Sequence, residues 1–224
     1  MMRFSFRIAA ALLWLGGLLL PAAPAAAQLD GASSLPTIAE KTEGMDRQDG
    51  YFPVYWDAQT GQLWLEIPRF TTVLYVTSLP TGLGSNPVGL DRGQLGARRV
   101  VRFERTGPTV LLVAPNLDYR ASTRNPAERA AVREAFAPGV LWDFEVAAEG
   151  PDGHVLVNAT EFVVRDAHGV ARRLKQTDQG SYALDAGRSV PFPAAVKAFP
   201  ENTELAARLT FTTDGRPGRY VRQT

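Results

Sequence analysis

Hydrophobic and polar positions begin to alternate near residue 50, and this pattern predicts paired β-strands. Residues 51–56 and 63–67 flank the segment 57–61, which ends in glycine, so the two runs predict a β-hairpin. Within 63–67 the odd-numbered aliphatic side chains share one face, and Trp64 and Glu66 lie on the other. The odd-numbered face is expected to point into a hydrophobic core.

Further runs rich in β-branched and aromatic residues predict more strands. They are residues 70–78, 98–105, 109–114, 140–148, 154–165 and 204–213. The second and third form a hairpin across Thr106–Pro108, and the fourth and fifth flank a turn at Pro151–Gly153. Residues 79–96 hold five glycines and two prolines without periodicity, which is typical of a long loop that is disordered or functional. Residues 174–184 are ambiguous.

One helix is predicted over residues 125–137. Asn125 suits the N-cap, Pro126 the first helical position, and Glu128 the third position after the cap. Val132 and Phe136 are four residues apart and share a helical face. The helix is expected to end at the proline and glycine that follow.

These elements predict a mainly β fold, either an antiparallel sandwich or a barrel-like domain, with about nine to eleven strands and one short helix. The pattern does not decide between sandwich and barrel. The predicted core residues are Leu63, Leu65, Ile67, Leu74, Val76, Val101, Phe103, Leu112, Phe144, Val146, Phe162 and Val164.

The N-terminus has the layout of a bacterial secretory signal peptide over residues 1–27. Two arginines precede an uncharged apolar run at 8–20, and alanines 25–27 form a small-residue cleavage site. The run is too short to span a bilayer of about 30 Å, although an uncleaved N-terminal anchor is the alternative. We expect an exported protein, periplasmic or extracellular, with no transmembrane segment after cleavage. Residues 28–49 are expected to form a flexible lead-in with one helical turn at 38–41, followed by a β-rich domain over 50–224.

Composition excludes several classes of chemistry. The chain has no cysteine, so it has no disulfide, no thiol nucleophile, no thiolate metal site and no lipidated cysteine. Without the two arginines of the leader, the 24 basic residues fall to 22 against 23 acidic ones. This balance does not predict binding to nucleic acid.

No catalytic or metal-binding residue is predicted. The two histidines, His154 and His168, lie in turns beside aspartate and glycine, where a solvated side chain is expected, and no His-Glu-x-x-His motif is present. Ser85 lies in a glycine-rich stretch, but proline occupies the last position of the dinucleotide fingerprint. The serine-hydrolase elbow Gly-x-Ser-x-Gly is also missing.

Two groups of residues are candidates for binding. Tyr55, Trp56 and Trp64 cluster across the first hairpin, where they form either an aromatic platform for sugar or peptide or part of the core. Arg172 and Arg173 form a small basic patch that either grips a carboxylate or is simply solvated.

Several blocks of the chain resemble the N-terminal region of bacterial secreted zinc-dependent metalloproteases. The blocks are residues 50–57 (GYFPVYWD), 61–67 (GQLWLEI), 114–120 (APNLDYR), 125–128 (NPAE), 165–174 (RDAHGVARRL) and 199–204 (FPENTE). The resemblance extends from about Lys41 to Tyr220 and implies an N-terminal domain of unknown function that precedes a metzincin-like catalytic domain. It implies zinc only in that associated domain, so this chain itself is expected to hold no cofactor and no catalytic residue.

The leading hypothesis is therefore a non-catalytic N-terminal domain, or a truncated fragment, that packs on or supports a metalloprotease domain downstream or in trans. The chain stops within a predicted strand at Gly218–Thr224, so the domain over 50–224 is expected to be incomplete at its C-terminal end. The alternative is a stand-alone periplasmic binding module for peptide or sugar, which would use the Trp56/Trp64 hairpin or the 79–96 loop.

Overall fold

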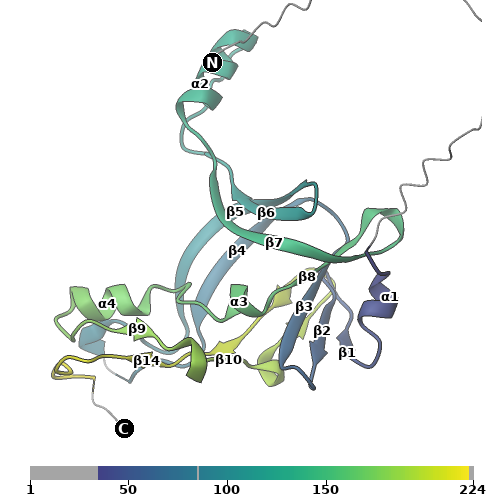
Figure 1. Ribbon diagram of the computed structural model, residues 1–224. Coiled ribbons are helices and arrows are strands. Elements are labelled where there is room, and N and C mark those ends of the chain that lie inside the picture. Colours follow the sequence, from purple (N-terminus) through teal and green to yellow (C-terminus); the bar gives the residue numbers. More distant parts are fainter. Residues whose placement is uncertain (1–34, 85, 222–224) are drawn as a thin grey trace, which may run out of the picture. The chain divides into compact units, whose positions relative to one another are not determined.

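The computed structural model describes residues 35–84 and 86–221, and the predicted signal peptide lies outside them. An eight-stranded antiparallel sheet dominates this part of the chain and curls strongly (Figure 1). Its strands are β1 (Asp46–Gln48), β2 (Val54–Asp57), β3 (Gln62–Ile67), β4 (Thr72–Leu79), β5 (Gln94–Thr106), β6 (Thr109–Ala114), β7 (Gly139–Glu149) and β8 (Val155–Asn158). The prediction of a mainly β, antiparallel fold is confirmed.

The spatial order of the sheet is β1-β2-β3-β8-β7-β6-β5-β4. Both predicted hairpins are present, with Trp56 opposite Leu63 in β2–β3 and Phe103 opposite Leu112 in β5–β6. Gly107 has a φ of 58° in the β5–β6 turn, a conformation that glycine adopts without steric cost. Because β1 and β4 occupy opposite ends of this order, the sheet is an open curl.

Six strands of two residues each and several short helices complete the described part. The strands are β9 (Ala183–Leu184), β10 (Val190–Pro191), β11 (Lys197–Ala198), β12 (Thr203–Glu204), β13 (Ala207–Arg208) and β14 (Phe211–Thr212). The helices are α1 (Ile38–Lys41), α2 (Pro126–Ala135), α3 (Thr160–Val163) and α4 (Val170–Gln176), with 3₁₀ turns at Asn86–Val88, Pro151–Gly153, Ala186–Arg188 and Pro193–Ala195. None of the described helices is long and apolar enough to cross a membrane.

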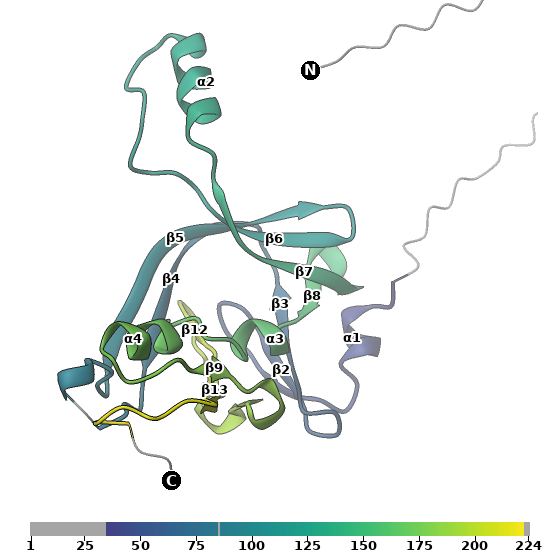
Figure 2. The same ribbon diagram turned by 60° about the vertical axis from the view of Figure 1, so that its left-hand side comes forward.

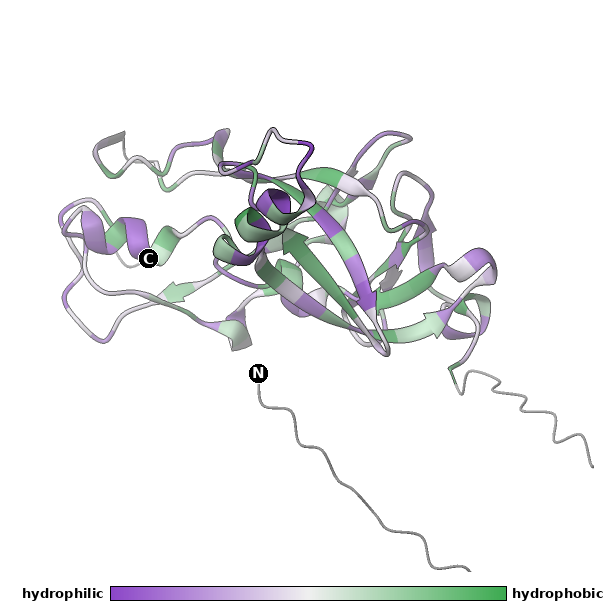
Figure 3. Ribbon diagram, turned by 90° about the horizontal axis from the view of Figure 1, so that it is seen from above, coloured by the Kyte–Doolittle hydropathy of each residue, from purple (hydrophilic) through white to green (hydrophobic). Residues whose placement is uncertain are grey.

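The main hydrophobic core fills the concave side of the sheet. Alternation along the strands places one hydrophobic face inward, and Figure 3 shows hydrophobic and hydrophilic positions alternating along the ribbon. The predicted core residues Leu63, Leu65, Ile67, Val101, Phe103, Leu112, Phe144, Val146 and Phe162 all belong to this cluster.

The C-terminal segment packs against the start of the first hairpin. The Phe52 N–H donates to the Thr203 hydroxyl at 3.0 Å, and the same hydroxyl donates back to the Phe52 carbonyl at 2.9 Å. Val196, in the same C-terminal segment, is buried in the main core. Residues about 150 positions apart thus close the open side of the curl.

A second, smaller core lies on the opposite, convex side beneath α1. Ile38 from this helix packs with Tyr55, Trp64 and Leu156. Thr37 begins α1 with a capping box, in which its side chain accepts from the Glu40 N–H and the Glu40 carboxylate accepts from the Thr37 N–H. Helix α1 matches the helical turn predicted at 38–41, and β1 also forms within the segment predicted to be a flexible lead-in.

A third core joins α4 to the 79–96 loop. Val170 and Leu174 of α4 pack against Val88 and Leu90 of the loop, with Phe211 at their edge. The long loop is thereby anchored to the C-terminal part of the chain. The sequence pattern did not predict that these two segments pack together.

The predicted inward face of β4 was wrong. Leu74 is 66% exposed and Val76 is also exposed, whereas Val73 and Tyr75 pack against the main core. Both faces of β4 are apolar, so alternation alone could not identify the inner one. Val164, also predicted to lie in the core, is only half-buried.

Two predicted strands were too long. The strand predicted over 154–165 stops at Asn158, whose side-chain oxygen accepts from the Thr160 N–H and starts the turn into α3. The strand predicted over 204–213 is divided among β12, β13 and β14, which pair with three different partners. Residues 218–221, expected to begin a further strand, are irregular.

Helix α2 matches the predicted helix, and Asn125 accepts from the Ala127 N–H at 2.9 Å as the expected N-cap. The helix buries none of its residues, and Figures 1 and 2 show it standing away from the curled sheet. We call residues 115–138, between β6 and β7, the arm. The arm is the entire β6–β7 connection, and none of its residues belongs to the described cores.

Candidate functional site

The three aromatic residues predicted to bind a ligand lie on both sides of the sheet. Tyr55 and Trp64 face each other across β2 and β3, and they are only 3% and 6% exposed. Trp56 points to the other side and packs against the main core. These positions favour the core interpretation of the aromatic cluster.

The two predicted arginines lie on α4, away from that hairpin. The Arg173 Nε donates to the Val88 carbonyl at 2.6 Å, so this side chain fastens α4 to the 79–96 loop. Arg172 is exposed and lies against Gly169, where an added Cβ would be 3.0 Å from Arg172 Nη2. The structure therefore does not bring the predicted aromatic and basic residues together.

A buried carboxylate lies on the convex side, at a position that sequence reasoning passed over. Glu66 is 7% exposed, and its Oε2 accepts from the Tyr55 hydroxyl at 2.7 Å. Its Oε1 lies 2.9 Å from His154 Nδ1. The histidine expected to be solvated in its turn is therefore held against a buried acid. The signal that could have revealed it is an acid placed among aromatic residues on one strand face.

This network predicts an alkaline pH dependence. Burial, together with the adjacent Glu66, raises the pKa of Tyr55 well above its ordinary value. Above about pH 10 the tyrosine ionises in the unfolded chain but stays protonated in the folded one, so the free energy of unfolding should fall by about 1.4 kcal/mol per pH unit from this group. Urea denaturation at several alkaline pH values should show a shallower decline for Tyr55→Phe. Equal slopes in the two proteins would contradict the prediction.

A second polar group lies on the concave side of β4 and β5. We call it the concave cluster, and it consists of Tyr75, Thr77, Arg99, Arg165 and His168. Tyr75 and Arg99 are register partners in β4 and β5, so their side chains share one face. Burial raises the pKa of Tyr75, and the charges of Arg165 and Arg99 oppose that rise. Sequence reasoning missed Tyr75, Arg99 and Arg165, because it assigned β4 the wrong inner face.

Arg165 is held rigidly in this cluster. Its Nε donates to the Phe162 carbonyl at 2.8 Å, and its Nη2 donates to the Tyr75 hydroxyl at 3.0 Å. The guanidinium also lies 4.6 Å from the ring centroid of Phe162 and 5.2 Å from that of Trp142. A fixed guanidinium of this kind loses little entropy when it binds an anion.

The other end of the concave cluster is a β-bulge. The register of the β4–β5 ladder shifts between Val76 and Ser78, and Thr77 lies beside Gly96. Within the described residues, the Thr77 hydroxyl and His168 Nδ1 are buried without a hydrogen-bond partner. Burial lowers the pKa of His168, although the charge of Asp166 partly opposes this. His168 was expected to be a solvated turn residue, and the structure instead packs its ring against the sheet.

Gly96 is the residue that permits this packing. An added Cβ would lie 2.4 Å from the Thr77 hydroxyl and 2.7 Å from His168 Nδ1. Gly96→Ala should therefore lower the free energy of unfolding by about 1–3 kcal/mol. Gly139→Ala is the matched control, since an added Cβ there meets nothing within 4 Å and should be neutral or slightly stabilising. Chemical denaturation of the two variants checks this, and equal stabilities would contradict it.

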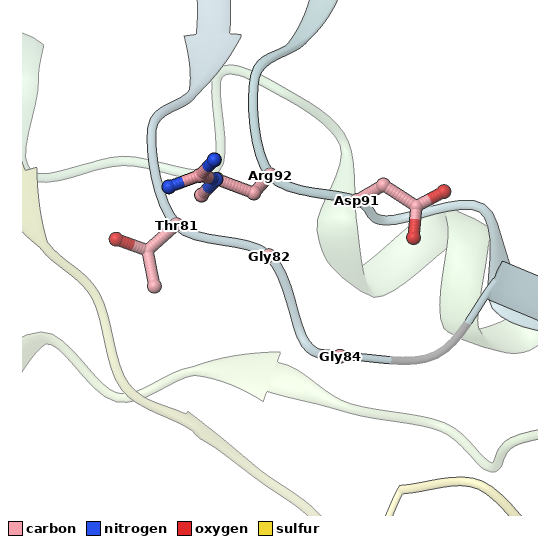
Figure 4. Close-up of a pocket in the computed structure, with 5 residues that line it drawn as sticks. All are labelled: Thr81, Gly82, Gly84, Asp91 and Arg92. Atoms are coloured by element: carbon pink, nitrogen blue, oxygen red, sulfur yellow. The ribbon is translucent and has the colours of Figure 1, made fainter.

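An open pocket of about 500 Å³ lies in the 79–96 loop (Figure 4). Its lining residues are Thr81, Gly82, Gly84, Asp91 and Arg92. The side chains of Asp91 and Arg92 point in opposite directions along the loop, so they do not converge on one ligand atom. Convergent polar groups mark a specific small-molecule site, and the described lining residues do not form such a group.

Two exposed apolar surfaces lie elsewhere. On the arm, the rings of Tyr119 and Phe136 stack with centroids 4.0 Å apart, and both residues are exposed. On the convex side of the β4–β5 hairpin lies a strip of four exposed residues, Leu74, Val76, Leu95 and Val100. We call these four the outer strip. Exposed apolar groups of this kind often mark interaction surfaces.

Residues 93–223, more than half of the chain, match the family described as Domain of unknown function (DUF5117). The chain belongs to the DUF5117 family. Neither the curated proteins nor the solved structures contain a match. In the part of the chain that the structure describes, no group of three or more histidine, aspartate or glutamate side chains is placed to hold a metal ion. The family match covers the concave cluster from Arg99 onward, the arm, and strands β6 to β14.

Proposed function

We propose that this DUF5117 chain is a non-catalytic domain of an exported protein, which docks onto the catalytic domain of a zinc-dependent metalloprotease. The proposal draws on the N-terminal signal sequence and on the six blocks that resemble the N-terminal region of such proteases. The catalytic zinc and its ligands would belong to the partner domain. The DUF5117 domain would supply a docking surface.

The observation that carries the proposal is the arm. Its helix buries no residue, and its stacked Tyr119 and Phe136 are exposed, together with Leu117. Ordering a 24-residue connection costs conformational entropy, and these contacts offset little of it within the described domain. Docking the aromatic pair into a partner would bury large apolar area, which is how interface hot spots stabilise complexes.

The first test measures the mass, the zinc content and the peptidase activity of the native exported product. An antibody to residues 41–224 should detect a polypeptide several-fold heavier than 24.3 kDa, or a complex that contains a second polypeptide. The purified material should contain stoichiometric zinc and a peptidase activity that a chelator abolishes. A product near the size of the chain, without zinc or peptidase, would reject the protease-associated role.

The second test uses the arm itself. The double variant Tyr119→Ala/Phe136→Ala should weaken association with the protease domain, while its circular dichroism and thermal unfolding stay close to the parent. The control Val190→Ala/Phe199→Ala removes one aliphatic and one aromatic exposed side chain from the C-terminal segment, outside both the arm and the β4–β5 hairpin. Equal loss of association in both double variants would show that the arm has no special role.

A stand-alone binding module is the second candidate. The concave cluster favours it, because Arg165 is immobilised in a site with no ion pair among the described residues. Such a module would bind an anionic ligand at native size and without a peptidase. The native-size experiment therefore separates the two functions.

A further inference from the structure

The concave cluster and the outer strip occupy opposite faces of one free sheet edge. β4 is the last strand of the sheet order and pairs only with β5 within the described residues. Such an edge presents unpaired backbone N–H and C=O groups, to which an extended peptide can add as a further strand. The β4 sequence TVLYVTSL contains no charge and no proline, the features that usually protect an edge from pairing.

The two faces of this edge differ in chemistry. On the convex side, Leu74 and Val76 of β4 are exposed and apolar. On the concave side, the Tyr75 hydroxyl accepts from Arg165, and Arg99 is the register partner of Tyr75 in β5, so the charges of both arginines act on the tyrosine. Side chains of an added strand would alternate between the same two faces. A fitting segment therefore has apolar residues at every second position and acidic residues between them.

The positive charges of Arg99 and Arg165 are not neutralised by an ion pair within the described residues. The nearby Asp166 is occupied, because its carboxylate accepts from the N–H groups of Gly169, Val170 and Ala171. Two guanidinium groups on one face of the sheet repel each other, and a carboxylate that accepts charge-assisted hydrogen bonds from them would relieve that repulsion.

We propose that the β4 edge binds an extended, acidic segment of a partner polypeptide, whose carboxylates contact Arg99, Arg165 and Tyr75 and whose apolar side chains cover Leu74 and Val76. This proposal extends the proposed docking function. It rests on that function only for the assumption that the ligand is a segment of a protein. A second copy of the chain does not fit. Pairing of two β4 edges would bring the arginines of both copies together with no acid on either strand.

The probe is a fluorescein-labelled octapeptide of alternating valine and glutamate, and binding to the purified chain is followed by fluorescence anisotropy. The expected result is saturable binding, with no binding of the matched valine–lysine peptide. Arg99→Glu should weaken binding at least about tenfold, since it places a like charge against the ligand. Arg98→Glu is the control, because Arg98 pairs with Val76 on the opposite face and should change affinity less than about twofold.

Two further measurements separate strand addition from simple charge attraction. Octapeptides N-methylated at alternate residues, made in both registers, should bind differently from each other, since one register blocks the hydrogen bonds to β4. Inorganic phosphate at equal ionic strength should not displace the peptide more than chloride does. Equal binding of both methylated peptides, full displacement by phosphate, or unchanged affinity of Arg99→Glu would each overturn the proposal.

The outcome is independent of the protease question. The probe contains no protease sequence, so failure to bind it would leave the native-size experiment unaffected. Conversely, a native product without a protease would leave the β4 edge as a site for an acidic segment of another partner. Circular dichroism of both arginine variants should match that of the parent, since both positions are exposed.

Discussion

Leu63→Ala is expected to lower the free energy of unfolding by about 2–5 kcal/mol. Leu63 is 0% exposed and belongs to the main core, which also contains Val157 and Phe162. Truncating it removes buried methyl groups and leaves a cavity, which its neighbours fill only partly because strands on both sides fix the backbone. The Leu63 backbone carbonyl accepts a hydrogen bond from the Ala159 N–H at 2.8 Å, and the substitution leaves this bond in place.

Leu74→Ala is the matched control for this substitution. The same side chain is removed from the same type of element, but Leu74 is 66% exposed, so the change should stay within about 0.5 kcal/mol. Urea denaturation of both variants measures the difference. Comparable losses at the two positions would mean that the inner face of β4 is assigned incorrectly.

Phe162→Ala should lower the free energy of unfolding by about 3–5 kcal/mol. Its ring packs against Tyr75, Trp142 and Phe144, with centroid distances of 5.9, 5.9 and 5.2 Å. It also supports the guanidinium of Arg165 from 4.6 Å. The variant therefore loses core packing and the platform that holds the concave cluster.

Phe136→Ala on the arm is the control for an aromatic truncation. Phe136 is exposed and its ring contact is with Tyr119 alone among the described residues, so the loss should be under about 1.5 kcal/mol. Thermal unfolding and denaturant titration of both variants give the comparison. A loss of several kcal/mol for Phe136→Ala would show that the arm packs on the domain more closely than its exposure indicates.

Alternation identified the inner face correctly wherever charges marked the outer one. In β5, Arg102 and Glu104 interrupt the apolar run, so Val101 and Phe103 could be assigned to the core. In β4 both faces are apolar, and the choice depends on register with β5, which no local pattern reveals. The helix α2 was predictable because its capping residues act locally.

The candidate sites were harder to predict than the strands. Glu66 meets His154 across 88 positions, and Tyr75 meets Arg165 across 90. The first contact arises from the β3–β8 ladder, and the second from the curl of the sheet and the turn at Asn158, which redirects the chain into α3. The binding residues predicted from the sequence were selected because they are aromatic or basic. The structure instead brings together residues that had no distinguishing feature in the sequence.

The position of β8 in the sheet has a consequence for how the chain folds. β1 to β3 form one local meander and β4 to β8 another, and every neighbouring pair within each is joined by a connection along the chain. Only the β3–β8 ladder, with Leu65 opposite Val157, joins the two meanders, so its residues meet across about 90 positions. Closing that distance has a high entropic cost, and we expect formation of this ladder to limit the folding rate. During synthesis, the free edge of β3 would stay unpaired until residue 158 has emerged and β8 is complete.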